Sequence, residues 1–208
     1  LIFVVVLTGI IYPIEASWQW GGGWLSEMGF SDFAGSTLVH AAGGFAALAG
    51  AIVLGPRIGK YKDGKTIPMP GSNLALATLG TFILWLGWFG FNGGSQLAAD
   101  GGAAMALTVT HISAATASLT WALWEKIKYG KASVVGIVTG AIAGLASITP
   151  ASGFVGPVEA LIIGAIAGIL CQEAVNLVRN VLKIDDTLDV FAVHGKDIQR
   201  VVDLQHIA

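Results

Sequence analysis

Apolar runs of similar length recur along the chain and are separated by short polar links. All but the first have about 20 residues, which in a helix rising about 1.5 Å per residue is enough to cross a hydrocarbon core of roughly 30 Å. The pattern therefore predicts an all-α fold, a polytopic transmembrane helical bundle. The runs occupy residues 1–14, 33–55, 74–92, 103–124, 132–151 and 156–178.

Lys and Arg fall in alternate links only. Because short basic loops stay on the cytoplasmic side of a membrane, we expect the links with these residues to be cytoplasmic and the others to face outside. This makes the chain a multi-pass protein of the cell membrane. The basic links are 56–73, 125–131 and 179–187, and the links without Lys or Arg are 15–31, 93–102 and 152–156. Aromatic residues near the run ends fit interfacial belts, Trp18, Trp20 and Trp24 outside and Trp121, Trp124 and Tyr129 inside.

The composition supports this class and argues against several others. Of the 208 residues, 54% are hydrophobic and 12% are charged, about half the charged fraction of soluble domains. The formal net charge is −2 and no basic patch indicates a nucleic-acid partner. The sequence has no nucleophile with a matched base, no Walker loop and no metal-type Cys/His spacing, so we expect no enzyme, cofactor or metal site. The single cysteine, Cys171, is expected to be a small core residue.

Small residues at four-residue spacing occur in two of the runs. In lipid, such faces let helix backbones approach closely, so we expect close helix contacts there. The residues are Gly136, Gly140 and Gly144 in one run and Gly164 and Gly168 in the next. Two carboxylates in or near the apolar runs, Glu159 and Glu173, are expected at helix ends or packed interfaces rather than in a catalytic pair.

Two stretches, 32–44 and 185–195, combine an acidic start with an apolar helix that contains one histidine. His40 lies about 10 Å into its run, where an ionisable side chain is costly unless it has a partner or lines a cavity. It is therefore a candidate functional residue, and a packed, hydrogen-bonded histidine is the alternative. On the predicted topology, His40 enters the membrane from outside and His194 from inside. The two can then meet near the midplane, as inverted repeats allow.

These stretches and several motifs resemble the ammonium transporter family. The resemblance covers residues 1–195 and rests on the segments 18–23, 32–40, 87–95, 149–151 and 186–195. It implies a helical bundle of about eleven spans with inverted halves, of which the chain matches the middle, with about five full spans and two partial ones. It also implies a homotrimer with one pore per subunit. The charged tail 196–208 does not match the family.

The resemblance also implies a function and residues for it. Ammonium is recruited at an outer aromatic site and ammonia then passes along a pore lined by a pair of histidines that share a proton. The recruitment site is Trp20 and Ser95 with Phe91 at the aromatic gate, and the supporting residues are Asp32 and Asp189. The pore residues are His40, His194, Trp88 and Thr149, of which Trp88 and Thr149 match positions that line the pore or support it. The implied partners are ammonium or ammonia, the lipid bilayer and a PII-type signal protein on the cytoplasmic face.

Other functions stay open at this point. The chain can instead be a non-conducting ammonium sensor or regulatory subunit that keeps the fold and the binding site. It can also be an incomplete, inactive fragment, because the family's second gate phenylalanine belongs to a third span that the chain lacks. We therefore expect the 208-residue chain not to conduct alone. His111 has no role implied by the resemblance and is expected to serve packing.

Overall fold

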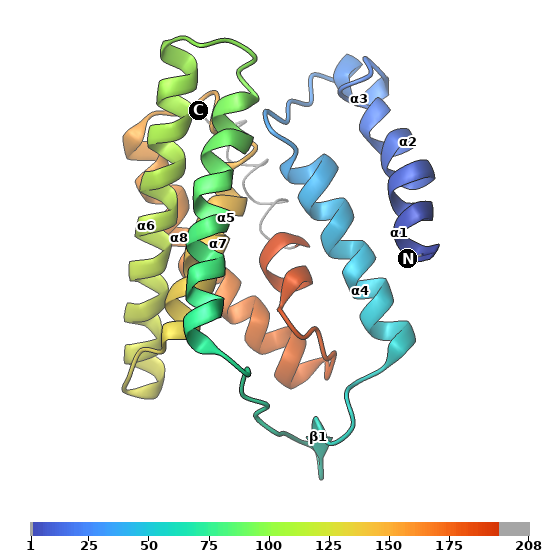
Figure 1. The fold of residues 1–208 in the computed structure, drawn as a ribbon, viewed down its shortest axis with the longest axis vertical. Helices are drawn as coiled ribbons and strands as arrows, with labels where there is room; N and C mark the ends of the chain where they lie inside the picture. The colour runs from blue at the N-terminus through green and yellow to red at the C-terminus, as the bar shows by residue number, and fades with distance from the viewer. Residues whose placement is uncertain (1, 196–208) are drawn as a thin grey trace.

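Long helices dominate the structure, a computed structural model that describes residues 2–195 (Figure 1). The charged tail lies outside the described residues. In chain order the elements are α1 (Ile2–Val6), η1 (Leu7–Ile11), α2 (Tyr12–Ser17), α3 (Trp24–Glu27), η2 (Ser36–Ala41), α4 (Ala42–Leu54), β1 (Tyr61–Lys62), β2 (Lys65–Thr66), α5 (Leu74–Gly94), α6 (Gly101–Tyr129), α7 (Val134–Ile148), α8 (Pro157–Asn176), η3 (Leu177–Val181) and η4 (Phe191–Gly195), where η marks a π-helical segment.

Four helices in the described residues are long and apolar enough to cross a membrane. They are Ser36–Leu54, Leu74–Gly94, Gly101–Tyr129 and Pro157–Val181. The helical class is confirmed, since the two-residue strands β1 and β2 form only a small antiparallel pair in a link. The expectation of a full-length span over 132–151 is wrong. Helix α7 has 15 residues and ends two residues before Pro150, which has no N–H to extend it.

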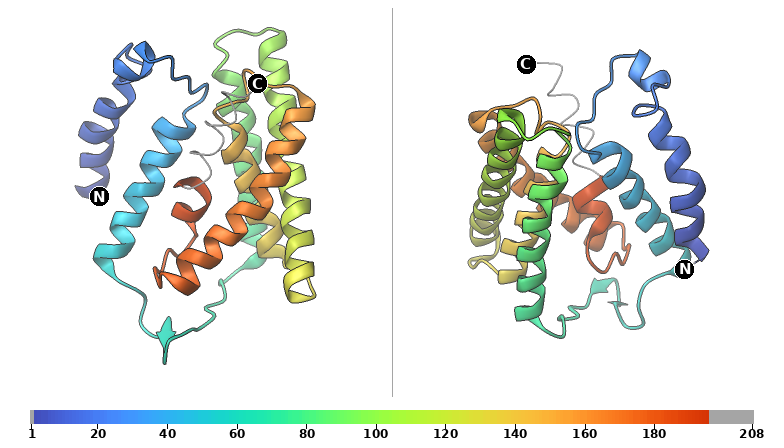
Figure 2. Two further views of the ribbon diagram at one scale, coloured as in Figure 1. Left: turned by 180° about the vertical axis from the view of Figure 1, so that it is seen from behind. Right: turned by 45° about the horizontal axis from the view of Figure 1, so that its top comes forward.

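The helices form two groups with η4 between them. Helices α5 to α8 pack together on one side, and α1, α2 and α4 lie on the other (Figures 1 and 2). The short segment η4 contacts α4, η2, α7 and α8. Residues at the end of the described chain therefore join the two groups, and they include His194.

The small residues bring α7 and α8 against the backbone of α6. A Cβ atom on Gly140 of α7 would lie 2.8 Å from the carbonyl oxygen of Ala117, and one on Gly168 of α8 would lie 2.6 Å from the same oxygen. Neither position has room for a larger residue, so the expectation of close helix contacts is confirmed. About one turn away, Gly144 of α7 and Gly164 of α8 approach the carbonyl oxygen of Ser113 in the same way.

Polar residues at the helix ends have structural partners. The N–H of Gly156 donates to Glu159 Oε2 at 3.0 Å, which caps α8. Glu173 accepts hydrogen bonds from Trp124 Nε1 at 2.6 Å and from Lys128 Nζ at 2.7 Å. Glu159 thus lies at a helix end, as the sequence predicted, and Glu173 joins α8 to α6 through a side chain that is 41% exposed.

Trp121 is not part of an interfacial belt, contrary to the sequence-based expectation. Only 4% of its surface is exposed, and it belongs to a buried cluster with Ala143 and Cys171. The reason is the small-residue face of α7, where Gly140 leaves room for the Trp121 side chain. Burial of Cys171 agrees with its expected core position.

His111 lies on an exposed face of α6, with its ring centroid 5.3 Å from that of Trp85.

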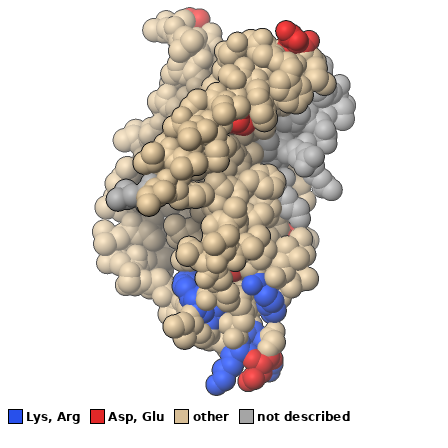
Figure 3. Space-filling view, turned by 90° about the vertical axis from the view of Figure 1, so that its right-hand side faces the viewer, with Lys and Arg blue, Asp and Glu red and all other residues tan. Residues whose placement is uncertain are grey.

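Basic side chains on the face shown in Figure 3 gather at one end of the molecule, and the band above them shows none. Two exposed sites test the topology that this separation indicates, Lys62 in a basic link and Ala98 in an opposite one. In a Cys171→Ala background, a membrane-impermeant maleimide added outside is expected to label Ala98→Cys and to leave Lys62→Cys unlabelled until the membrane is permeabilised. Labelling of Lys62→Cys from outside without labelling of Ala98→Cys would contradict this topology and indicate the inverted one.

Candidate functional site

The site begins with a buried carboxylate that fixes the start of η2. Asp32 Oδ1 accepts hydrogen bonds from the N–H groups of Gly35 and Ser36, both at 2.9 Å. Asp32 Oδ2 accepts from Thr37 at 2.7 Å and from Leu38 at 3.2 Å. These are the N–H groups that a helix start leaves without intrahelical partners. Asp32 therefore holds the helix that presents His40, and its oxygens are already occupied.

Trp20 is attached to the same turn. Its Nε1 donates to the backbone carbonyl oxygen of Asp32 at 3.1 Å. The indole also passes close to Gly35, where a Cβ atom would lie 2.8 Å from Trp20 Cη2. Gly35 has φ +96°, a left-handed conformation that glycine adopts without strain. Since 46% of the Trp20 surface is exposed, the indole is oriented by the protein and still accessible.

His40 and His194 come from different helical segments and meet inside the protein. Their ring centroids are 5.1 Å apart and the ring planes differ by 12°. Trp88 lies nearly parallel to both, with its centroid 5.0 Å from that of His40. Phe91 approaches His40 edge-on at 5.4 Å. The structure therefore brings together four of the residues that the resemblance singled out.

Each histidine has a buried nitrogen without a partner. Within the described residues, His40 Nε2 and His194 Nδ1 make no hydrogen bond. The resemblance implied a proton shared between the rings, whereas the rings here are stacked. A buried polar atom usually has a partner, so these two nitrogens make the histidine pair the candidate site for a small polar molecule. A neutral imidazole offers it one donor and one acceptor.

Thr149 supports this arrangement from behind. Its hydroxyl accepts a hydrogen bond from Trp88 Nε1 at 2.9 Å and donates to the carbonyl oxygen of Leu145 at 2.7 Å. Thr149 is fully buried and Trp88 is 7% exposed. Of the two roles that the resemblance allowed for Thr149, lining or supporting, the geometry favours support, because the hydroxyl fixes the orientation of the indole beside His40.

The remaining recruitment residues lie at the end of α5. Ser95 Oγ donates to the carbonyl oxygen of Phe91 at 2.7 Å, and Phe91 is 37% exposed. Within residues 2–195, no hydrogen bond or ring contact joins Ser95 or Phe91 to Trp20. The three residues therefore do not form a connected cluster through the contacts of this structure.

The resemblance implied Asp189 as a supporting residue and did not single out Asp186. Asp186 Oδ2 accepts a hydrogen bond from the N–H of Phe191 at 2.7 Å, at the start of η4. Asp189 instead forms an ion pair with Arg179. Asp186 precedes His194 by eight residues, the same spacing that separates Asp32 from His40. That equal spacing was the signal for a matching cap.

The described residues contain no group of three or more His, Cys, Asp or Glu side chains suited to a metal ion. The site therefore consists of aromatic rings, imidazoles and the carboxylates that hold their helices.

A family model described as the Ammonium Transporter Family matches residues 1–197. The chain belongs to the ammonium transporter family.

Curated ammonium transporters are similar over nearly the whole chain. It is 46% identical over 195 residues to an ammonium transporter of Aquifex aeolicus, covering 94% of this chain and 44% of that protein. It is 49% identical over 185 residues to ammonium transporter Amt1 of Archaeoglobus fulgidus, covering 89% of this chain and 46% of that protein. The chain thus spans less than half the length of these relatives.

Solved structures of family members have the same fold. A structure named Sensor Amt Protein superposes with a TM-score of 0.89 at 43% identity, covering 94% of this chain and 50% of that chain. Candida albicans Mep2 gives a TM-score of 0.87 at 40% identity, covering 94% of this chain and 43% of that chain. A multi-pass membrane location follows from this membership and the membrane-length helices.

Proposed function

We propose that this chain forms the central part of a transmembrane path for ammonium and ammonia. In this proposal ammonium is recruited at an outer site with Trp20, Ser95 and Phe91, and ammonia then passes His40 and His194. The observation that carries the proposal is the meeting of the two histidines beside Trp88, with an unpartnered buried nitrogen on each ring.

The chemistry of the two groups of residues supports this order of events. An exposed indole attracts a cation through its ring quadrupole, so ammonium is captured as the charged form. Moving that charge through an apolar interior is expensive, whereas neutral ammonia costs far less and can hydrogen-bond to each imidazole in turn. Potassium has no proton to lose, which gives selectivity a chemical basis.

Trp20→Leu in the full-length protein tests the recruitment step. A cation contact with an aromatic face is worth about 0.5–2 kcal/mol, so we expect the apparent ammonium affinity to fall roughly two- to thirty-fold. Trp24→Leu is the matched control, because Trp24 is 51% exposed and its ring contacts that of Trp18, at a centroid distance of 5.8 Å, rather than the site. Ammonium uptake against concentration is the measurement. Equal affinities in the two variants would make Trp20 an interfacial anchor.

The sensor alternative is not favoured, because the curated relatives described above are named as ammonium transporters. We further propose that the chain acts as a homotrimer in the bilayer, with one pore per subunit. A PII-type signal protein is the proposed partner on the cytoplasmic face. The basic links on that side supply a charged surface for such contacts.

A further inference from the structure

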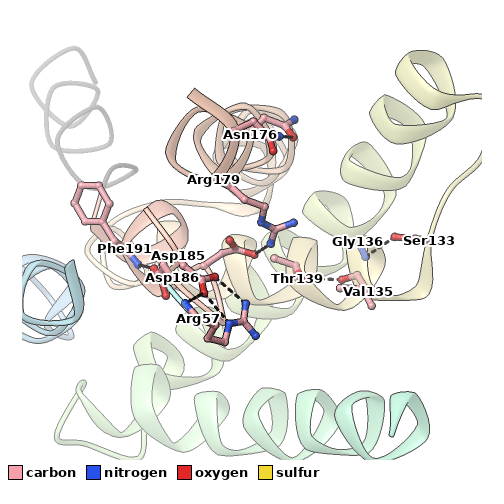
Figure 4. Close-up of polar contacts among 12 residues, drawn as sticks. Arg57, Ser133, Val135, Gly136, Thr139, Asn176, Arg179, Asp185, Asp186 and Phe191 are labelled. Carbon is pink, nitrogen blue, oxygen red and sulfur yellow. Dashed lines mark hydrogen bonds and ion pairs between the residues drawn. The ribbon is translucent and has the colours of Figure 1, made fainter. Parts of the chain in front are cut away.

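Two links on the basic side of the molecule are joined by an ion pair. Arg57, in the link after α4, donates from Nε to Asp185 Oδ2 and from Nη2 to Asp185 Oδ1, both at 2.7 Å (Figure 4). The backbone N–H of Arg57 adds a third bond to Oδ2 at 3.0 Å. The two residues are 128 positions apart. The pair therefore connects the helix with His40 to the link that leads to His194.

The Asp185 side chain of this ion pair is covered by protein, whereas the Arg57 side chain is partly exposed. The Asp185 side chain is only 2% exposed and that of Arg57 is 40% exposed. Hydrogen bonds from Arg57 lower the pKa of the Asp185 carboxyl from its ordinary value of 3.8 to about 2. The pair's contribution to stability is therefore complete above the ordinary pKa and is lost only as pH falls through about 2. It stays charged at physiological pH.

The next residue in the link carries the constraint to η4. Asp185 is followed by Asp186, whose carboxylate accepts the N–H of Phe191 at 2.7 Å at the start of η4 (Figure 4). Asp186 also accepts the N–H of Asp189 through its backbone oxygen at 3.1 Å. His194 follows in η4, with its ring stacked on His40. A fixed Asp185 thus fixes the cap that sets the position of His194.

We propose that Arg57 is a positioning residue for His194. Its planar guanidinium holds both oxygens of Asp185 and thereby sets the direction of the 182–190 link. The direction of this link in turn sets the position of η4 along η2. The proposal deepens the proposed function and rests on it where it concerns selectivity. Its structural part, the position of η4, stands on these contacts alone. Lys cannot replace Arg fully, since an ammonium group lacks the two-pronged geometry.

The test compares Arg57→Met and Arg57→Lys with Lys62→Met in the full-length protein in lipid. Lys62→Met is the matched control, because Lys62 is an exposed cation in the same link. Hydrogen exchange of the amides from Phe191 to Gly195 and the ¹⁵N imidazole resonances of His194 report on η4. Potassium competition with ammonium uptake reports on selectivity. Unchanged exchange in α6 identifies a folded variant.

Arg57→Met removes both guanidinium hydrogen bonds to Asp185, so it is expected to speed exchange of the Phe191 amide at least about tenfold and to shift the His194 resonances. For Arg57→Lys, the exchange rate and the His194 resonances are expected to lie between those of Arg57→Met and those of the wild type. If Arg57→Met does not fold, Arg57→Lys alone is compared with the control. Lys62→Met is expected to change neither readout.

The results separate this inference from the proposed function. If amide exchange in η4 and the His194 resonances are the same in the Arg57 variants as in Lys62→Met, the inference is overturned, whatever the uptake measurement shows. A displaced η4 with unchanged potassium exclusion supports the positioning role and contradicts the function proposed for the histidine pair. A displaced η4 together with potassium competition supports both.

Discussion

Replacing Asp32 by Leu is expected to leave little or no folded protein in the membrane. The change removes an acceptor for four backbone N–H groups and leaves them buried, since Asp32 is only 2% exposed. Hydrogen bonds to a charged group contribute about 1.5–3 kcal/mol each, so even partial loss approaches the whole stability of about 5–15 kcal/mol of a typical protein.

The amount of folded protein extracted in mild detergent measures this effect. Asp100→Leu is the matched control, because Asp100 caps α6 with hydrogen bonds from Gly102 and Ala103 but lies in an exposed loop. Water can solvate those N–H groups when the cap is lost, so we expect near-normal amounts. Similar losses in the two variants would show that Asp32 is an ordinary helix cap.

Replacing His40 and His194 together is expected to reduce ammonia conduction about as much as replacing either alone. The two rings are in contact and form one polar path, so removing one interrupts the path for the other. Groups in direct contact are coupled by about 0.5–3 kcal/mol, which corresponds to roughly a two- to 150-fold departure from independent effects. Uptake rates of the two single variants and the double variant measure this coupling.

The outline of the fold follows from the sequence because the bilayer imposes it. Uncharged runs of membrane length and the alternating Lys and Arg predicted the spans, and the repeated acidic start before each histidine predicted a meeting of His40 and His194. Both features are local in the chain. The short helix α7 was missed because an apolar composition does not fix where a proline ends a helix.

Side-chain partners distant in the sequence could not be predicted in the same way. Trp88 and Thr149 are 61 residues apart, and only their hydrogen bond shows that the hydroxyl supports the indole. Burial of Trp121 depends on a glycine of another helix. The Arg57 contact with Asp185 likewise has no pattern in the chain, because an arginine in a basic link is expected to face water.

The central claim is that His40 and His194 act as one unit that conducts ammonia and excludes potassium. The most direct measurement is ammonium uptake, with and without competing potassium, in wild type, His40→Ala, His194→Ala and the double variant of the full-length protein, each corrected for its amount in the membrane. We predict that each single variant loses uptake and potassium exclusion about as much as the double variant. Losses that add in the double variant and leave potassium exclusion unchanged would contradict the claim and make both residues packed core histidines.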